Sequence, residues 1–274
     1  SGYLGDLNSF TARYAKPIEI EKDEQAAFAL KNITAPFMLR RLKTDKSIIN
    51  DLPDKIVIDE YSSMVPKQAA MYESIVQESL KQLETLEPKD RFGLVFKLIT
   101  ELKQVCNHPR NLDKVSPSSS QLSGKAQILI ELLETILSKK EKVLIFTQYV
   151  EMAKIISEII EKELLVEPLI LDGSMSKNAR QKVVDSFENT DEFPVFILSL
   201  KAGGVGLNLT SASNVIHYDL WFNPAVENQA TDRAFRIGQT KNVFVYRFIT
   251  KNSFEEKIDN MIKAKLAIGE MSVA

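Results

Sequence analysis

The chain has 274 residues, of which 44% are hydrophobic and 26% are charged, a composition typical of a soluble, well-packed protein. Its 35 Lys and Arg residues and 37 Asp and Glu residues give a net charge of −2, which excludes a basic field over the whole surface. Any nucleic-acid contact must therefore depend on a local patch. One Cys and two His exclude a disulfide framework and are too few ligands for structural zinc, so we predict no metal site within the chain.

The apolar runs and the start of the chain limit the possibilities further. No apolar run approaches the roughly 18 residues of a membrane span, and no signal peptide opens the sequence. We therefore expect an intracellular protein, cytoplasmic or associated with the nucleoid in a prokaryote and nuclear in a eukaryote. The sequence begins Ser1-Gly2-Tyr3-Leu4 without Met, and we expect the native start to lie upstream.

The first part of the chain, from about residue 20 to 113, has mostly helical periodicity. Apolar residues recur about every 3.6 positions over 72–83 and again over 95–105, which predicts two helices. The segment 55–63 alternates apolar and polar residues over part of its length and predicts a strand. The serine-rich segment 116–123 predicts a polar linker with little to bury.

After residue 123, short apolar runs alternate with helical stripes. These runs predict strands at 143–146, 168–171, 195–198, 215–218 and 243–248. Repeated strand–helix–strand units with uniformly apolar strands form parallel sheets covered by helices, so we predict an α/β fold. The loops that follow the strands of such a sheet lie along one edge, where ligands bind.

The segment 224–237 predicts a helix with a signal at each end. Asn223 suits the N-cap, Pro224 suits the first helical position, and Gly238 suits the residue that ends the helix.

Gln229, Arg233 and Arg236 fall at positions i, i+4 and i+7 of that predicted helix, which places them on one face. Guanidinium groups bind phosphate oxygens through two parallel hydrogen bonds and keep their charge, so this face suits phosphate. The alternative is a solvated helix whose arginines pair with Asp232 or Glu227.

A glycine-rich segment directly follows the strand predicted at 195–198. Gly203, Gly204 and Gly206 would let backbone N–H groups approach a phosphate closely. The segment fits neither GxxxxGK[ST] nor GxGxxG, and a tight turn without a ligand remains an open alternative.

Two further loops carry groups that suit an anion. The segment 171–176 leads from a strand into a helix, and helix N-termini offer backbone N–H groups to anions. The segment 146–149 ends another predicted strand in polar side chains. On the predicted topology these two loops, the glycine-rich segment and the arginine segment all line the same edge of the sheet, which favours phosphate binding there.

Together these segments resemble the second RecA-like lobe of SWI/SNF-type helicase-like ATPases, within superfamily two. The resemblance covers essentially the whole chain. Its blocks are KVLIFTQY (142–149, motif IV), LDGSMSKNAR (171–180), LSLKAGGVGLNLTSAS (198–213, motif V), QATDRAFRIGQT (229–240, motif VI), PFMLRRLKTD (36–45) and LKQVCNHP (102–109). The chain departs from many relatives at Phe235, where they carry His.

The resemblance implies a RecA-like parallel sheet flanked by helices. We expect the second lobe to be built from 116–274, with an interlobe segment at 1–54. A strand at 55–65 is expected to join the sheet, and a helical projection is expected at 66–115.

The resemblance also implies half of a motor. The sequence holds neither GK[ST] nor DEAH, so ATP and Mg²⁺ are expected to bind mainly to a first lobe that lies outside this chain. In the family, two arginines of motif VI reach the ATP phosphates, which assigns Arg233 and Arg236 as catalytic fingers. The nucleotide-binding residues implied are Gln229, Gly204 and Gly206. The isolated chain is expected to be inactive.

Members of this family track the backbone of double-stranded DNA, so the implied partner is double-stranded DNA bound without sequence specificity. The residues implied to contact it are Thr147, Gln148, Gly173, Ser174, Lys201, Gly203 and Trp221. For Trp221 the alternative is packing against the protein.

Two other functions remain open from the sequence. One is a lobe of an RNA or single-strand helicase, which the RIGQ ending and the helical projection argue against. The other is a non-enzymatic interaction module that kept the fold, which would leave the arginines replaceable.

Overall fold

The computed structural model describes residues 4–18, 23–34, 53–87, 90–199 and 207–271. The chain divides into two compact units, one formed by Ser1–Asn50 with Asp259–Ala274 and the other by Asp51–Ile258. The block at 36–45 that resembles the family lies outside the described residues.

The described N-terminal part of the first unit is helical. It contains α1 (Leu7–Phe10), the π-helix η2 (Thr11–Ala15) that continues it, and α2 (Glu24–Thr34). Asp6 caps α1, because its carboxylate accepts the backbone N–H of Ser9 at 2.8 Å.

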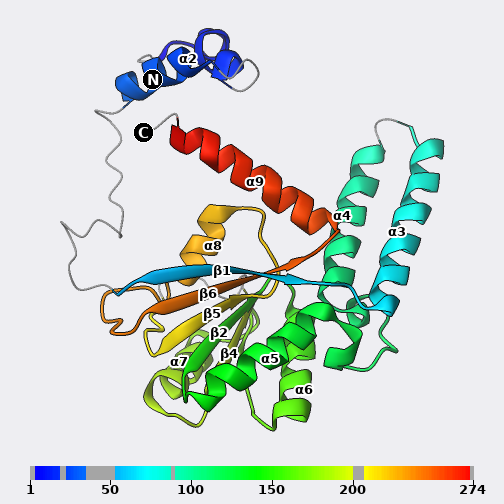
Figure 1. Cartoon of the computed structure of the whole chain (residues 1–274), viewed down its shortest axis with the longest axis vertical. Helices are drawn as coiled ribbons and strands as arrows, with labels where there is room; N and C mark the ends of the chain where they lie inside the picture. Colours follow the sequence, from blue (N-terminus) through cyan, green and yellow to red (C-terminus); the bar gives the residue numbers. More distant parts are fainter. Residues whose placement is uncertain (1–3, 19–22, 35–52, 88–89, 200–206, 272–274) are drawn as a thin grey trace. The chain divides into compact units, whose positions relative to one another are not determined.

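The second unit is organised around one sheet of six parallel strands in the order β1-β6-β5-β2-β4-β3 (Figure 1). The strands are β1 (Lys55–Ser62), β2 (Lys142–Thr147), β3 (Leu169–Leu171), β4 (Val195–Ser199), β5 (Ala212–His217) and β6 (Val243–Thr250). Every strand expected from the sequence is present, and the prediction of a RecA-like parallel sheet is confirmed.

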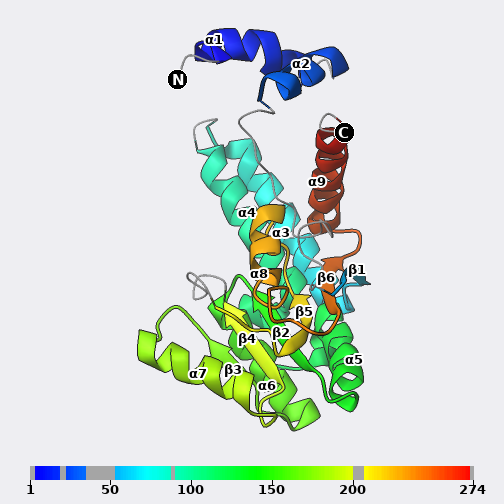
Figure 2. The same ribbon diagram turned by 90° about the vertical axis from the view of Figure 1, so that its left-hand side faces the viewer.

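Alternate residues of the inner strands enter separate cores on the two faces of the sheet. Val143 and Ile145 of β2 pack with α5 (Gly124–Ser138) and α6 (Val150–Leu164) on one face. Leu144 and Phe146 pack with α7 (Lys177–Asn189) and the buried segment after α8 (Pro224–Thr231) on the other. Figure 2 shows α5 and α7 on opposite sides of the sheet. Burial on both faces explains why these strands read as continuous apolar runs.

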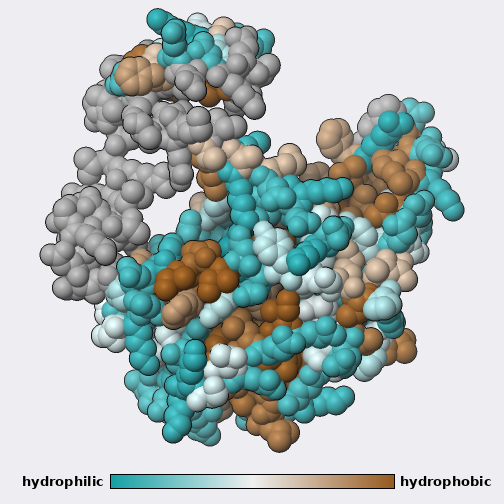
Figure 3. Space-filling model, in the orientation of Figure 1, coloured by the Kyte–Doolittle hydropathy of each residue, from teal (hydrophilic) through white to brown (hydrophobic). Residues whose placement is uncertain are grey.

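Helices α3 (Pro66–Thr85) and α4 (Arg91–Asn107) lie side by side and project away from the sheet (Figure 1). Apolar side chains stay exposed on this pair, with Phe92 74% and Phe96 70% accessible, and Figure 3 shows brown atoms over it. The last helix, α9 (Phe254–Met271), begins in the second unit directly after β6. In the part of the chain that the structure describes, no helix is both long and apolar enough to cross a membrane.

The serine-rich segment is not the open linker that the sequence predicts. Ser116, Ser118, Ser120 and Ser123 are all buried, and a 3-10 helix covers Ser120–Leu122. The hydroxyl of Ser118 accepts a hydrogen bond from Arg110 at 2.6 Å and donates one to Glu158 at 2.6 Å. The prediction was wrong because small hydroxyl side chains satisfy their hydrogen bonds inside the protein as readily as in water.

Gly124 begins α5 where the helix touches the end of β1. A Cβ atom at this position would lie 1.9 Å from the carbonyl oxygen of Ser63, so the contact requires glycine. The side chain of Gln68 on α3 accepts the backbone N–H of Gly124 at 3.0 Å and donates to the carbonyl oxygen of Val105 at 2.9 Å. Gln68 therefore joins helices α3 and α4 to the start of α5, where α5 touches the end of β1.

Candidate functional site

The predicted phosphate-binding loops follow strand ends that lie together. Thr147 pairs with Ser199, and Leu171 pairs with Leu198, so the carboxyl ends of β2, β3 and β4 meet at one edge of the sheet. The glycine-rich loop after β4 lies outside the described residues, and with it the predicted site residues Lys201, Gly203, Gly204 and Gly206.

The end of β2 is tied to the end of β5 through Asp219, whose side chain is fully buried. Its carboxylate accepts hydrogen bonds from the hydroxyl of Thr147 at 2.5 Å and from the backbone N–H of Gln148 at 3.0 Å. The amide of Gln148 donates to the carbonyl oxygen of Leu220 at 2.7 Å. The hydrogen-bonding groups of Thr147 and Gln148 that were predicted to face DNA thus hold the loop in place.

The loop after β3 is shaped by Asp172, which accepts both the backbone N–H of Ser174 at 2.8 Å and its hydroxyl at 2.5 Å. These bonds lower the pKa of Asp172. Arg180 on α7 donates to the carbonyl oxygens of Met175 at 3.0 Å and Gly173 at 3.2 Å. Gly173 and Ser174 remain exposed, and a Cβ atom at Gly173 would meet open space.

Trp221, the only Trp of the chain, is half-buried in a loop whose backbone is held on several sides. Its backbone N–H donates to the carboxylate of Glu227 at 2.9 Å. The amine of Lys103 on α4 donates to the carbonyl oxygen of Leu220 at 2.9 Å and lies 4.5 Å from the ring centroid of Phe222. Phe222 adopts a left-handed backbone conformation with φ of 53°. Surrounding side chains therefore hold Trp221 in a loop whose backbone is strained at Phe222.

The predicted helix over 224–237 is wrong in its second half. It begins as expected, with Asn223 accepting the N–H of Ala225 at 3.1 Å, but α8 ends at Thr231. Residues beyond it form turns. Gln229 lies exposed on α8, whereas Arg233 and Arg236 lie on the turns, so the three do not share one helix face.

A tertiary hydrogen bond replaces the missing helical one. In a continuing α-helix the carbonyl oxygen of Arg233 would accept the N–H of Ile237, but here it accepts the N–H of Leu209 at 2.9 Å. Ala234 and Phe235 turn into the core, and Phe235 is only 3% exposed. The aromatic ring at 235 is therefore a packing residue.

Gln239 joins the arginine segment to the strand entry that follows the glycine-rich loop. Its side-chain amide is buried and donates to the carbonyl oxygens of Thr210 at 3.1 Å, Ala212 at 2.8 Å and Ala234 at 3.2 Å. Its side-chain oxygen accepts the N–H of Lys241 at 2.9 Å. The two segments that resemble motifs V and VI thus form one bonded assembly.

The two arginines differ in environment. Arg233 is 8% exposed, and burial lowers the pKa of its guanidinium from the usual value. Arg236 is exposed. A guanidinium group that reaches solvent fits a phosphate chemically. Within the described ranges no group of three or more His, Cys, Asp or Glu side chains is placed to hold a metal ion.

A fully buried ion pair lies behind this edge. The amine of Lys125 on α5 lies 2.9 Å from a carboxylate oxygen of Glu255 on α9, and neither side chain is exposed. The same amine donates to the side-chain oxygen of Asn107 at 3.2 Å. The amide of Asn107 donates to Asp219 at 3.0 Å, and its backbone carbonyl oxygen accepts the hydroxyl of Tyr218 at 3.0 Å. This network joins the base of α4 to the ends of β2 and β5.

Both histidines are buried and structural. The Nδ1 atom of His108 accepts the N–H of Arg110 at 3.1 Å, and its Nε2 lies 3.0 Å from the carbonyl oxygen of Ser119. Burial lowers the pKa of His108, and burial with the nearby charges of Arg247 and Lys55 lowers the pKa of His217 to about 3. The neighbouring Cys106 is buried, and burial raises the pKa of its thiol.

Reasoning from the sequence missed three residues that organise the site: Asp219, Glu227 and Gln239. Each is buried and polar, and its partners are set by the fold. The weak signal available was a polar residue beside an apolar run, as at Asp219, which directly follows the strand predicted at 215–218.

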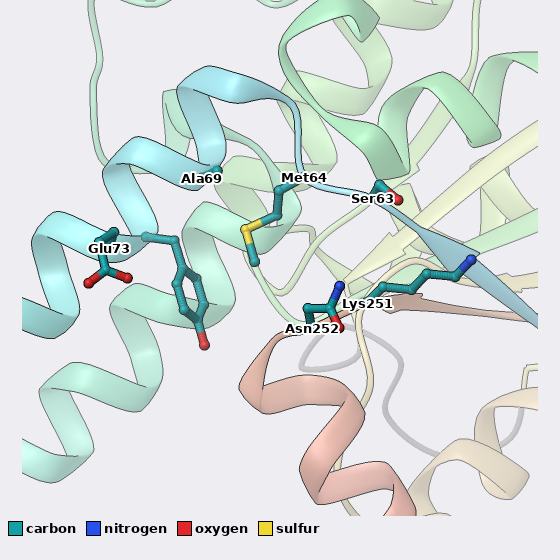
Figure 4. Close-up of a pocket in the computed structure, with 7 residues that line it drawn as sticks. Ser63, Met64, Ala69, Glu73, Lys251 and Asn252 are labelled. Carbon is teal, nitrogen blue, oxygen red and sulfur yellow. The ribbon is translucent and has the colours of Figure 1, made fainter.

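A cavity of about 360 Å³ opens elsewhere, where β1 leads into α3 and β6 leads into α9. Figure 4 shows the side chains of Glu73 and Lys251 on its walls, with Met64 between them. None of the predicted site residues lines this cavity.

The chain matches two protein families. Residues 124–238 match the helicase conserved C-terminal domain, and residues 1–111 match the SNF2-related domain. The boundary between these matches falls just after α4.

Several related proteins resemble most or nearly all of the chain. YwqA of Bacillus subtilis, described as an ATP-dependent helicase/translocase, is 42% identical over 99% of this chain, which spans 30% of that relative's length. The SWI2/SNF2 ATPase core of Sulfolobus solfataricus in complex with dsDNA is 43% identical, with a TM-score of 0.72, over 97% of this chain and 56% of its own. The C-terminal domain of the Sulfolobus ATPase is 38% identical, with a TM-score of 0.68, over 78% of this chain and 87% of its own.

Proposed function

This chain belongs to the SWI2/SNF2 family of ATPases, and from that premise we propose that it is the C-terminal motor lobe of an ATP-driven translocase on double-stranded DNA. The observation that carries the proposal is the bonded assembly of Leu209, Arg233 and Gln239, which joins the arginine segment to the segment after the glycine-rich loop. Such an assembly lets a nucleotide and a DNA backbone act on one rigid body.

We propose that Arg233 and Arg236 reach the phosphates of ATP held mainly by a first lobe. Guanidinium groups there would stabilise charge that develops on the transferred phosphoryl group. Gln229, exposed on α8, and the glycines Gly204 and Gly206 would line the same cleft. Mg²⁺ would be held by the first lobe. We propose this lobe as a partner of the chain, besides double-stranded DNA.

The proposed DNA surface is the carboxyl edge of the sheet. Gly173 and Ser174 are exposed there on a loop fixed by Asp172 and Arg180, and Trp221 is half-buried on a neighbouring loop. Thr147 and Gln148 would contribute by holding the end of β2, and Lys201 and Gly203 would add contacts from the glycine-rich loop. These groups meet the DNA backbone and carry no base readout, so binding should be independent of sequence and sensitive to salt.

The proposal also covers the activity of the isolated chain and the location of the protein. Because the second lobe supplies only part of the nucleotide site, the isolated chain should hydrolyse ATP negligibly. The activity would belong to an intracellular protein that acts on DNA.

Steady-state ATP hydrolysis, with and without double-stranded DNA, tests the proposal. The 274-residue chain should show negligible ATP hydrolysis. A longer form that includes the first lobe should hydrolyse ATP faster with DNA than without it. Turnover by the chain alone would show a complete nucleotide site that the proposal lacks. A folded longer form without turnover would favour an interaction module instead.

A further inference from the structure

The carboxylate of Glu227 on helix α8 makes two contacts. It accepts a hydrogen bond from the Trp221 loop and forms an ion pair with Arg247. Glu227 lies two residues before Gln229 and is 8% exposed. One carboxylate oxygen accepts the backbone N–H of Trp221 at 2.9 Å. The other accepts the guanidinium Nε–H of Arg247 on β6 at 3.0 Å.

The ion pair is itself anchored to the sheet. A second nitrogen of Arg247 lies 2.7 Å from the carboxylate of Asp59 on the neighbouring strand β1. The side chains of Arg247 and Glu227 are 17% and 11% exposed, so solvent screens their attraction little. The position of the Glu227 carboxylate is therefore fixed by two strands, and α8 and the Trp221 loop are both set by it.

The Trp221 loop runs through Asn223 into α8, and the backbone N–H of Trp221 adds a side-chain link to the same helix; the rest of the loop is held by other elements. Lys103 and Gln148 hold the carbonyl oxygen of Leu220. The ring of Phe222 packs edge-on against Phe254 with centroids 5.8 Å apart. Among these bonds, the one to Glu227 alone joins the loop to the helix that leads into the arginine segment.

We infer that Glu227 is a positioning residue that couples the DNA-facing loop of Trp221 to the segment carrying Arg233. This inference rests on the proposed function, because it assigns DNA contact to Trp221 and phosphate contact to Arg233. When the loop shifts on DNA, the carboxylate transmits the shift to α8, and α8 leads within two residues into the segment bearing Arg233. Glu227 touches neither substrate in this scheme.

The charge-neutral variant Glu227→Gln tests the inference while keeping side-chain size. It keeps an oxygen for the N–H of Trp221 but loses the ion pair with Arg247. In the longer form with both lobes, we expect the ratio of DNA-stimulated to basal ATP hydrolysis to fall roughly tenfold. Arg247→Gln should reduce the same ratio, and the double variant should be no worse than either single one.

A matched control is Glu158→Gln, which removes a carboxylate from a surface ion pair with Arg110. It should leave the ratio unchanged. A merely structural role for Glu227 would lower basal and stimulated rates by the same factor, together with the folded fraction. An unchanged ratio in Glu227→Gln would overturn the inference.

Fluorescence gives a second readout that needs no ATPase activity. Since Trp221 is the only Trp, its emission and its quenching by acrylamide report the loop directly in the 274-residue chain. Glu227→Gln should increase the quenching constant, and Glu158→Gln should leave it unchanged. Identical quenching in wild type and Glu227→Gln would overturn the positioning role. If the wild-type longer form shows no stimulation by DNA, the proposed function fails, and the fluorescence result still decides whether Glu227 positions the loop.

Discussion

Lys125 and Glu255, 130 positions apart in the chain, form an ion pair 2.9 Å long in which neither side chain is exposed. The pair joins the start of α5 to the start of α9. A buried charge without its partner is costly, whereas a buried pair replaced as a whole by apolar side chains is often tolerated. The pair therefore makes a sharp prediction about single and double variants.

We predict that Lys125→Met or Glu255→Leu alone lowers the free energy of unfolding by about 4 kcal/mol. The double variant should lose less than the sum of the two, because no uncompensated charge remains. Urea denaturation of the four proteins measures this coupling. Additive losses would show that the two charges do not stabilise one another.

Gln239 should tolerate no negative charge. In Gln239→Glu a carboxylate would face the carbonyl oxygens of Thr210, Ala212 and Ala234, and we expect a loss of about 3 kcal/mol in unfolding free energy. The same change at exposed Gln229 is the control and should cost less than about 0.5 kcal/mol. Urea denaturation measures both losses, and equal losses in the two variants would show that the contacts of the Gln239 amide do not stabilise the fold.

His217 should make the protein less stable in acid. Its pKa is about 3 in the folded protein against roughly 6.5 in the unfolded chain, so only the unfolded chain takes up a proton between those values. Stability is therefore unaffected above pH 6.5 and falls as the pH drops toward 3. At pH 5 the loss from this residue should be about 2 kcal/mol.

The measurement is urea denaturation at pH 7 and pH 5 for wild type and His217→Gln. The variant should show a smaller loss between the two pH values. His108→Gln is the companion variant, and it should shift the profile in the same direction because burial lowers the pKa of His108 as well. A pH profile identical to wild type in His217→Gln would contradict the assignment.

Substitution of Arg233 and Arg236 should have different effects on stability and on catalysis. Because Arg236 is exposed, Arg236→Ala should fold normally and lose about a thousandfold in kcat in the form with both lobes. Because Arg233 is buried, Arg233→Ala should lose both kcat and stability. ATP hydrolysis at saturating DNA, with a thermal melt of each variant, tests this. A kcat within twofold of wild type for Arg236→Ala would contradict its assignment as a finger.

The strands could be predicted from the sequence because their signal is local. Val143 to Phe146 is apolar on both faces, and it lies between two cores in the structure. The start of α8 was predicted as well, since Asn223 and Pro224 act on the backbone beside them.

The end of α8 could not be predicted from local signals. Gly238 has a positive φ of 105°, yet α8 ends earlier, at Thr231, and beyond it the carbonyl oxygen of Arg233 pairs with the distant N–H of Leu209. The same reason hides the role of Asp219, whose partners Thr147 and Asn107 lie 72 and 112 positions away. Helix propensity depends on neighbours in the chain, whereas the conformation and partners of these residues depend on neighbours in space.

The placement of β1 beside β6 has a consequence for synthesis on the ribosome. Among the strands that the structure describes, β1 comes first in the chain and pairs with the last, β6, as Asp59 and Arg247 stand 188 positions apart. At roughly 5–20 residues per second, β1 waits on the order of ten seconds or more with an unpaired edge before β6 emerges. Val57 and Tyr61 are still 53% and 37% accessible in the finished sheet. During that delay we expect the unpaired edge of the nascent strand to be open to pairing with other chains, and we expect the sheet to close late in folding.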